Sequence, residues 1–150
     1  MTKALLIIGC SQRKVSTHPS QTLYAMYRYD GPTYRCLRKL YREGRFPDNL
    51  DVLIISARYG LLQWREPILN YEQKMTAARA DELRPFVQER LKEIVTVQQY
   101  DQVFINLGKR YMRTLADFHW GNLISTMEAS GGIGQKTQQM KVWLEQIYGR

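Results

Sequence analysis

The hydrophobic residues of the chain follow two patterns: short runs that are apolar throughout, and longer segments in which apolar residues recur every three or four positions. The short runs lie at residues 4–8, 52–55, 103–105 and 123–124. Uninterrupted apolar runs of this length are typical of strands buried on both faces of a parallel sheet, whereas strict alternation would indicate a sheet with one wet face. We therefore expect a mainly parallel central sheet.

The longer segments between these runs predict helices. Gly31-Pro32 opens one that runs to about Glu43, because proline is favoured at the first helical position. A second covers about residues 76–97, where Pro85 either kinks it or begins another helix. Further helices are expected after Gly108 and Gly134. The core faces of the second and last helices are predicted to comprise Phe86, Leu91, Ile94 and Val95, and Ile133, Met140, Leu144 and Ile147. Strands alternating with helices predict a three-layer α/β/α fold.

Composition is near the globular average, with 44% hydrophobic and 24% charged residues among 150. This length supports one core, so we expect a single α/β domain over residues 1–150. No apolar run approaches the roughly 20 residues of a membrane span, and the first is too short for a signal peptide. Cys10 and Cys36 are too few for a disulfide framework and lack zinc-site spacing. We therefore expect a cytoplasmic protein with free thiols and no metal, cofactor or membrane partner. The sequence leaves the oligomeric state open.

Charge is unevenly distributed. The net charge is +8, and residues 1–50 contain nine basic and three acidic residues. A soluble basic surface and an anionic partner, either nucleic acid or nucleotide, explain this bias equally well. Arg35, Arg38 and Arg42 share one helix face opposite the apolar stripe, so they are predicted to form a solvent-facing basic ridge.

Ligands of open parallel sheets bind beyond the carboxyl ends of the strands, which directs attention to the residues after each apolar run. After the first run, Gly9 permits close backbone approach, and Ser11, Arg13 and Lys14 offer donors and positive charge. This loop resembles a phosphate-binding loop, although it lacks the G-x-x-x-x-G-K spacing. The alternative is a plain turn.

The second strand is followed by residues 56–62, which suit the binding of a planar ring. Tyr59 offers a face for stacking, Ser56 can form a hydrogen bond to a base, and Gly60 permits a turn. A tight turn with Tyr59 packed in the core explains the segment equally well.

Two later segments can attract an anion. Residues 106–111 combine a helix start with two cations, and residues 131–136 combine glycines, free backbone N–H groups and a lysine. Solvated helix charges and a flexible loop are the alternatives. The phosphate-binding candidates of the last segment are Gly132, Gly134 and Lys136.

We expect the loop after the first strand and the loop before the last helix to face each other across one pocket, bridged by one anion. Lys14 and Lys136 would supply charge there, and Tyr59 a ring face.

Common catalytic motifs are absent: the sequence has no G-x-S-x-G, H-E-x-x-H or C-x-x-C. Candidate catalytic residues are Cys10, Ser11 and Ser56. Nearby cations favour a thiolate at Cys10, but a buried cysteine is the more common outcome. No spacing rule selects an acid–base carboxylate, so the sequence does not decide whether the protein is an enzyme.

The order of these motifs resembles that of a family of uncharacterised bacterial and phage domains. The segment at residues 59–71 is also similar to one in the YaaA peroxide-stress proteins, and a weaker similarity exists to the archaeosine synthase domain with a cysteine-serine-lysine motif. The residues that carry the resemblance are Gly9-Cys10-Ser11, Lys14, Leu23-Tyr24, Asp30-Gly31, Ser56 to Leu62, Ile68, Tyr71, Gly134-Gln135 and Trp143-Leu144.

This resemblance implies a fold like that of uracil-DNA glycosylases and a role in DNA or modified-base metabolism; it transfers no catalytic residue. The expected function is binding of a nucleotide, a modified base or single-stranded nucleic acid, with action on a base or its N-glycosidic bond. The alternative is a non-catalytic interaction module in stress response or phage defence.

Overall fold

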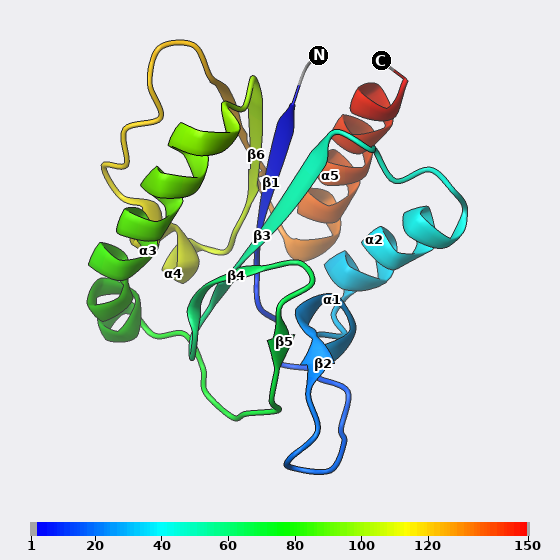
Figure 1. Cartoon of the computed structure of the whole chain (residues 1–150), viewed down its shortest axis with the longest axis vertical. Helices are drawn as coiled ribbons and strands as arrows, with labels where there is room; N and C mark the ends of the chain where they lie inside the picture. Colours follow the sequence, from blue (N-terminus) through cyan, green and yellow to red (C-terminus); the bar gives the residue numbers. More distant parts are fainter. Residues whose placement is uncertain (1–2, 150) are drawn as a thin grey trace.

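A mainly parallel five-stranded sheet forms the centre of the computed structural model, which describes residues 3–149 (Figure 1). Its strands are β1 (Ala4–Gly9), β3 (Leu50–Ser56), β4 (Gly60–Gln63), β6 (Gln102–Asn106) and β7 (Ser125–Glu128). They are arranged in the order β4-β3-β1-β6-β7, with only β4 antiparallel to its neighbour. This architecture confirms the predicted α/β class.

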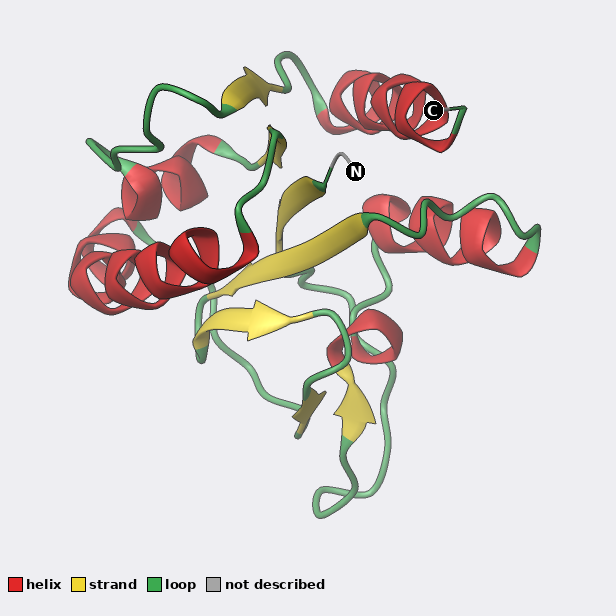
Figure 2. Cartoon of the chain, turned by 45° about the horizontal axis from the view of Figure 1, so that its top comes forward, coloured by secondary structure: helices red, strands yellow, loops and turns green. Residues whose placement is uncertain are grey.

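Helices cover both faces of the sheet (Figures 1 and 2). One face packs against α2 (Pro32–Arg42) and α5 (Ile133–Tyr148), and the other against α3 (Ala77–Gln98), α4 (Lys109–Met112) and the 3₁₀ turn Arg113–Leu115. Two hydrophobic cores result, one on each side of the sheet. No helix of the described residues combines the length and apolar character needed to cross a membrane.

Beyond the carboxyl ends of β1 and β3 lies a small cap, made of β2 (Leu23–Tyr24), α1 (Ala25–Arg28) and β5 (Pro67–Ile68) (Figure 1). Arg28 is fully buried in this cap. Its guanidinium donates to the Val15 carbonyl at 2.7 Å, and to Thr17 Oγ1 and the Gln21 carbonyl at 2.9 Å each. These bonds tie the loop after β1 to the cap.

Three of the four predicted strands agree with the structure to within a few residues, and the fourth is displaced. Residues 123–124 are not a strand; β7 begins at Ser125, and its four residues are all exposed. β7 belongs to the sheet because its backbone pairs with β6. The short strands β2, β4 and β5 were not predicted, since none has an apolar run of sufficient length.

Two residues predicted for the helix cores are exposed. Phe86 is 70% exposed on α3, where Val87 is buried instead. Ile133 is 70% exposed because it is the first residue of α5 and lies before the packed turns of the helix. Pro85 lies inside one continuous helix, α3, so no second helix begins there.

The predicted basic ridge on α2 is wrong at Arg38. Its side chain is only 15% exposed and forms a 2.7 Å ion pair with Asp30. It also donates to the carbonyls of Met26 and Tyr29, at 2.8 Å each. Arg35 contacts the same Asp30 carboxylate at 3.3 Å. These two arginines therefore hold the cap against α2.

The two sides of α3 give a direct test of its core face. We expect Val87→Ala to lower the free energy of unfolding by about 1–3 kcal/mol, because it leaves a cavity beside the sheet. Phe86→Ala, the matched control, should change it by less than about 0.5 kcal/mol, as is usual for exposed positions. Urea denaturation of both variants checks this, and equal losses would contradict the packing described.

Acid titration tests the Asp30 network. Hydrogen bonding to Arg35, together with the charges of Arg35 and Arg38, holds the pKa of Asp30 below its usual value. The stabilisation is therefore present above the unfolded-state pKa of about 4 and is lost as pH falls below it. Asp30→Asn should lower the melting temperature at pH 7, and the gap from wild type should close near pH 3.

Asp48→Asn is the control for this titration, since Asp48 is exposed and has no ion pair among the described residues. A gap between wild type and Asp30→Asn that stays constant from pH 7 to acid would show that the carboxylate charge of Asp30 does not stabilise the fold.

Candidate functional site

The carboxyl ends of β1, β3, β6 and β7 meet at one edge of the sheet. From β1 the chain leaves toward β3, whereas from β6, the neighbour on the other side, it leaves toward β7. Such a reversal is the topological switch point at which open α/β sheets bind ligands. The candidate site is therefore the space beyond β1 and β6.

Cys10 lies at this switch point, directly after β1. Its N–H donates to the Ile55 carbonyl at 2.9 Å, and its Sγ lies 3.1 Å from the Tyr111 hydroxyl. The Tyr111 ring packs so closely on Gly9 that a Cβ there would come within 3.3 Å of it. Because Gly9 has no side chain, the Tyr111 ring can pack against it and bring its hydroxyl close to the Cys10 sulfur.

Ser11 continues this loop and contacts the start of α2. A Cβ on Gly31 would lie 2.8 Å from Ser11 Oγ, so only glycine fits at this position without a shift of the serine. Ser11 is half-buried beside the N-terminus of an 11-residue helix. Both loop residues proposed as catalytic, Cys10 and Ser11, therefore lie at the predicted edge.

A network of hydroxyl groups fills the space between the cap and the end of β3. The Tyr29 and Tyr71 hydroxyls lie 2.6 Å apart, and each contacts Ser56 Oγ, at 3.3 and 3.0 Å. Tyr34 completes the group by donating its hydroxyl to the Gly9 carbonyl at 2.7 Å. Three tyrosines from the cap, its flanks and α2 thus converge on the ends of β1 and β3.

These phenols are held in their protonated form. Burial raises the pKa of Tyr29, Tyr34, Tyr71 and Tyr111, and the nearby Cys10 raises each further. Protonated phenols carry no charge, so neutral hydroxyl groups surround the Cys10 side chain at physiological pH.

The segment after β3 forms a tight turn. Ser56 is 0% exposed, and its Oγ accepts from the N–H groups of Arg58 and Tyr59 at 3.2 and 3.1 Å. Gly60 has φ +81°, the left-handed region that favours glycine. Ser56 thus shapes the turn, and Tyr59 remains partly exposed with its ring edge-on to Tyr71 at 5.4 Å.

The two lysines predicted to share an anion take different partners. Lys14 Nζ lies over the Tyr71 ring, 4.5 Å from its centroid, beside the end of β3. Lys136 Nζ donates to the Leu107 carbonyl at 2.9 Å, directly after β6. The strand β1 lies between these positions. An anion bridging the lysines therefore stays a prediction.

The glycine loop before α5 is open. A Cβ on Gly132 or Gly134 would meet nothing within 4 Å. The Gly132 N–H is occupied, since it donates to Gln135 Oε1 at 2.9 Å. Thr137, one turn into α5, lies 3.4 Å from Thr33 of α2 between their hydroxyls. The N-terminal turns of the two helices are therefore neighbours at this edge.

The structure thus places Gly9, Cys10, Ser11, Lys14, Ser56, Tyr59 and Gly60 around the ends of β1 and β3, and Lys136 at the end of β6. Arg13 points away, with a side chain 73% exposed and 3.5 Å from Asp30. Sequence reasoning gave no role to Tyr29 and Tyr34. No local pattern marks them, because the partners of their hydroxyls lie 25 to 42 residues away.

Two cavities are described, and neither lies at this edge. One, of about 580 Å³, borders the amino end of β3, and the other, of about 210 Å³, lies between α2 and α5 near their C-terminal ends. Within residues 3–149, no three His, Cys, Asp or Glu side chains are grouped so that they could hold a metal ion.

Comparison with known proteins gives a fold and a family. The solved structure of AF0587, described as a protein of unknown function, is similar with a TM-score of 0.57 at 14% identity. The alignment covers 96% of this chain and 45% of that chain, and at this identity it shows the fold alone. No curated protein matches the chain. The model of a family of unknown function, DUF6884, matches residues 5–144. The chain therefore belongs to the DUF6884 family.

Proposed function

We propose that the carboxyl edge of the sheet binds a nucleotide or a short single-stranded segment of nucleic acid. One observation carries this proposal: cations follow each parallel strand at this edge. We call them the basic rim, and they are Lys14 after β1, Arg58 after β3, Lys109 and Arg110 after β6, and Lys136 after β7. Such a convergence of positive charge attracts phosphates.

The tyrosines supply the features that a base requires. Tyr59 keeps part of its ring exposed, and Lys14 lies beside it over Tyr71. Ring stacking combined with hydrogen bonding is the usual way in which proteins hold single bases. The resemblance to YaaA proteins and to the uracil-DNA-glycosylase fold adds that the base is modified or that its N-glycosidic bond is the target.

Cys10 is the reactive group in this proposal. Its thiol lies at the switch point within hydrogen-bond distance of Tyr111. The neutral Tyr111 phenol beside it can donate a hydrogen bond to a polar atom of a ligand held at the thiol.

A second candidate function is a non-catalytic interaction module. The observation that favours it is the position of the 580 Å³ cavity, which borders the amino end of β3 and contains none of the basic rim.

The basic rim predicts a specific pattern of binding. We expect Lys14→Ala/Lys136→Ala to fold normally and to bind nucleoside phosphates or a short single strand about 10- to 100-fold more weakly, the loss of about 1–3 kcal/mol typical of charge-assisted hydrogen bonds. The control, Lys39→Ala/Lys92→Ala, removes two exposed lysines from α2 and α3. Isothermal titration calorimetry of wild type and both variants measures the difference.

Salt dependence separates specific contact from general attraction. For a single strand, log affinity should fall with log salt by a slope of about −0.7 per contacted phosphate, and the rim variant should show a shallower slope than its control. If wild type binds no member of a panel of nucleotides, modified bases and single strands, or if both double variants lose affinity equally, the basic rim is not the binding site.

A further inference from the structure

Most of the positive charge in the N-terminal third of the chain lies outside the basic rim. Residues 1–50 contain nine basic and three acidic residues, and only Lys14 among them belongs to the rim. Two of the three acids are already paired, because Asp30 contacts three arginines and Glu43 lies 3.7 Å from Arg45. The exposed side chain of Arg42 has no ion pair or hydrogen bond among residues 3–149.

Three tyrosine rings are exposed on the outer surface of the cap and on the adjoining end of α2. Tyr24, Tyr27 and Tyr41 are between 44% and 48% exposed. Tyr24 is the residue before α1 and Tyr27 lies within it, three positions apart, so they are neighbours on one side of this turn. The hydroxyls of Tyr24 and Tyr27 have no partner among the described residues. These rings contribute little to the core and are free to contact a ligand.

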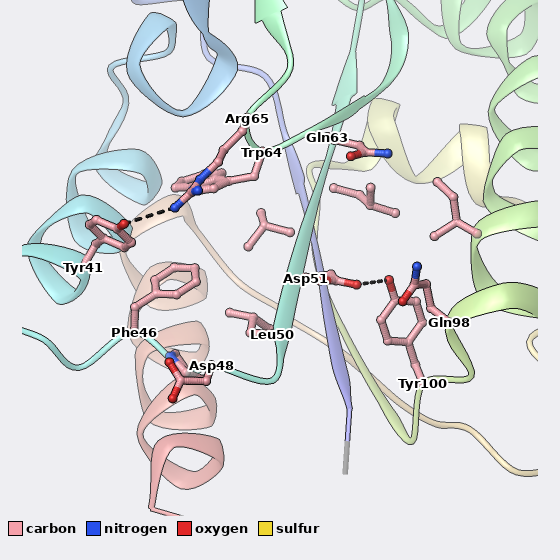
Figure 3. A pocket seen from close by; sticks show the side chains of 14 residues that line it. Tyr41, Phe46, Asp48, Leu50, Asp51, Gln63, Trp64, Arg65, Gln98 and Tyr100 are labelled. Carbon is pink, nitrogen blue, oxygen red and sulfur yellow. Dashed lines mark hydrogen bonds between the residues drawn. The ribbon is translucent and has the colours of Figure 1, made fainter. Parts of the chain in front are cut away.

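Arg65 connects the ring on α2 with the rings of the cap. Its guanidinium donates to the Tyr41 hydroxyl at 3.1 Å, as Figure 3 shows, and it has no ion pair among the described residues. Two residues further along the chain, Pro67 pairs with Tyr24 in the small sheet of β2 and β5. A cation therefore lies next to exposed rings on both elements.

Arg42 extends this surface along α2. Arg38, one turn earlier on the same side of the helix, donates to the Met26 carbonyl of α1 at 2.8 Å, so this side of α2 faces the cap. We call the exposed rings and the two unpaired cations the cap track, and its residues are Tyr24, Tyr27, Tyr41, Arg42 and Arg65.

The cap track begins where the basic rim ends. Lys14 of the rim forms a β-bridge with Tyr29, the residue directly after α1. The next residue, Val15, donates its N–H to the Arg28 carbonyl at 2.8 Å. One ligand that leaves the rim at Lys14 therefore meets α1 and its exposed rings.

We propose that the cap track binds a nucleic-acid strand that continues from the carboxyl edge, so that the ligand is single-stranded nucleic acid and not a free nucleotide. Bases stack on the exposed tyrosines, and phosphates contact Arg42 and Arg65. The proposal rests on the proposed function for the position of one end of the strand, at the basic rim. The contacts of the track itself are tested separately.

The combination of rings and cations selects this ligand over two others. A duplex stacks its bases on each other and offers no free base faces to three exposed rings. An acidic peptide supplies carboxylates for the arginines but no bases for the rings. An unpaired strand carries a phosphate and a base in every unit, so it matches both features of the track.

Length dependence is the first test. Displacement of a fluorescent strand, followed by anisotropy, measures the affinity for thymidine monophosphate and for oligothymidylates of up to about 12 nucleotides, within the range of known single-strand sites. We expect the affinity to rise about tenfold or more once the strand reaches beyond the rim. A duplex of the same length should bind more weakly than the single strand.

A variant of the track locates the added affinity. Tyr27→Ala/Arg65→Ala should bind the longest strand about 10- to 100-fold more weakly, with a log–log salt slope shallower by about 0.7, and should bind the monophosphate as wild type does. Tyr27→Phe keeps the ring and should bind like wild type. The matched control, Tyr148→Ala/Lys92→Ala, removes a similarly exposed tyrosine and an exposed lysine elsewhere. Circular dichroism checks that each variant is folded.

Photochemical cross-linking tests the position of the strand directly. An oligonucleotide with a single 5-iodouridine is irradiated in complex with the protein, and the linked peptide is identified by mass spectrometry. We expect cross-links at Tyr24, Tyr27 or Tyr41. Cross-links confined to residues outside the cap and α2 would overturn the proposal.

The remaining outcomes separate the track from the rim. Affinity that does not rise with length, equal losses in the track and control variants, or equal binding of a duplex would overturn the cap track. Displacement of the strand by polyglutamate at equal charge concentration would identify an acidic protein as the partner instead. If Lys14→Ala/Lys136→Ala weakens monophosphate binding and the track variant changes nothing, the rim stands without the track. If only the track variant loses strand binding, the track stands and the proposed function at the rim fails.

Discussion

The burial of β1 on both faces is the constraint on which the rest of the structure depends. Its residues from Leu5 to Ile8 are 0% exposed, and they alternate between the two cores, with Leu6 and Ile8 on one side and Leu5 and Ile7 on the other. Because both faces of β1 are buried, only residues beyond the ends of this strand can contact a ligand. Cys10, the first residue after β1, contacts both cores, so it is the point at which the interior opens to the carboxyl edge.

Tyrosine side chains stabilise the region in which the core meets the carboxyl edge of the sheet. Each phenol buries an aromatic ring in the core and brings a hydroxyl that needs a partner. Here the hydroxyls of Tyr29 and Tyr71 satisfy each other and Ser56, while those of Tyr34 and Tyr111 reach Gly9 and Cys10. The cap is therefore held against the sheet by buried hydrogen bonds. These are electrostatically stronger than solvent-exposed ones because the local dielectric is low.

The sequence predicted those parts of the fold that depend on local pattern. The strands β1, β3 and β6 are continuous apolar runs, and α2 begins at the expected proline. The error at β7 has a physical reason: all its residues are exposed, so pairing with β6 rather than burial makes it a strand. Phe86 was misassigned because Phe86 and Val87 are neighbours and both are apolar. The helix continues through Pro85 without a break, and it places Val87 rather than Phe86 against the core.

The site was predictable only in its location. Parallel strands bring their carboxyl ends together, which places Cys10, Ser11 and Ser56 at one edge from sequence alone. The pairing of Tyr29 with Tyr71 joins residues 42 positions apart through the cap, and no spacing rule connects them. Arg38 was predicted to face solvent for a similar reason, because helical periodicity cannot anticipate that Asp30 and two carbonyls of α1 and its end lie over that face.

The single antiparallel strand determines how the two ends of the sheet differ. β4 returns directly from β3, so its hairpin covers the carboxyl half of that strand; the Trp64 N–H still donates to the Val52 carbonyl, and the Trp64 carbonyl accepts from Met26 of the cap. This change of pairing partner brings Tyr71 to the carboxyl edge and uncovers Leu50 at the amino end. The segment after β4 thus extends the pairing of β3 as far as Val52 and then carries Tyr71 to the hydroxyl network at the carboxyl edge.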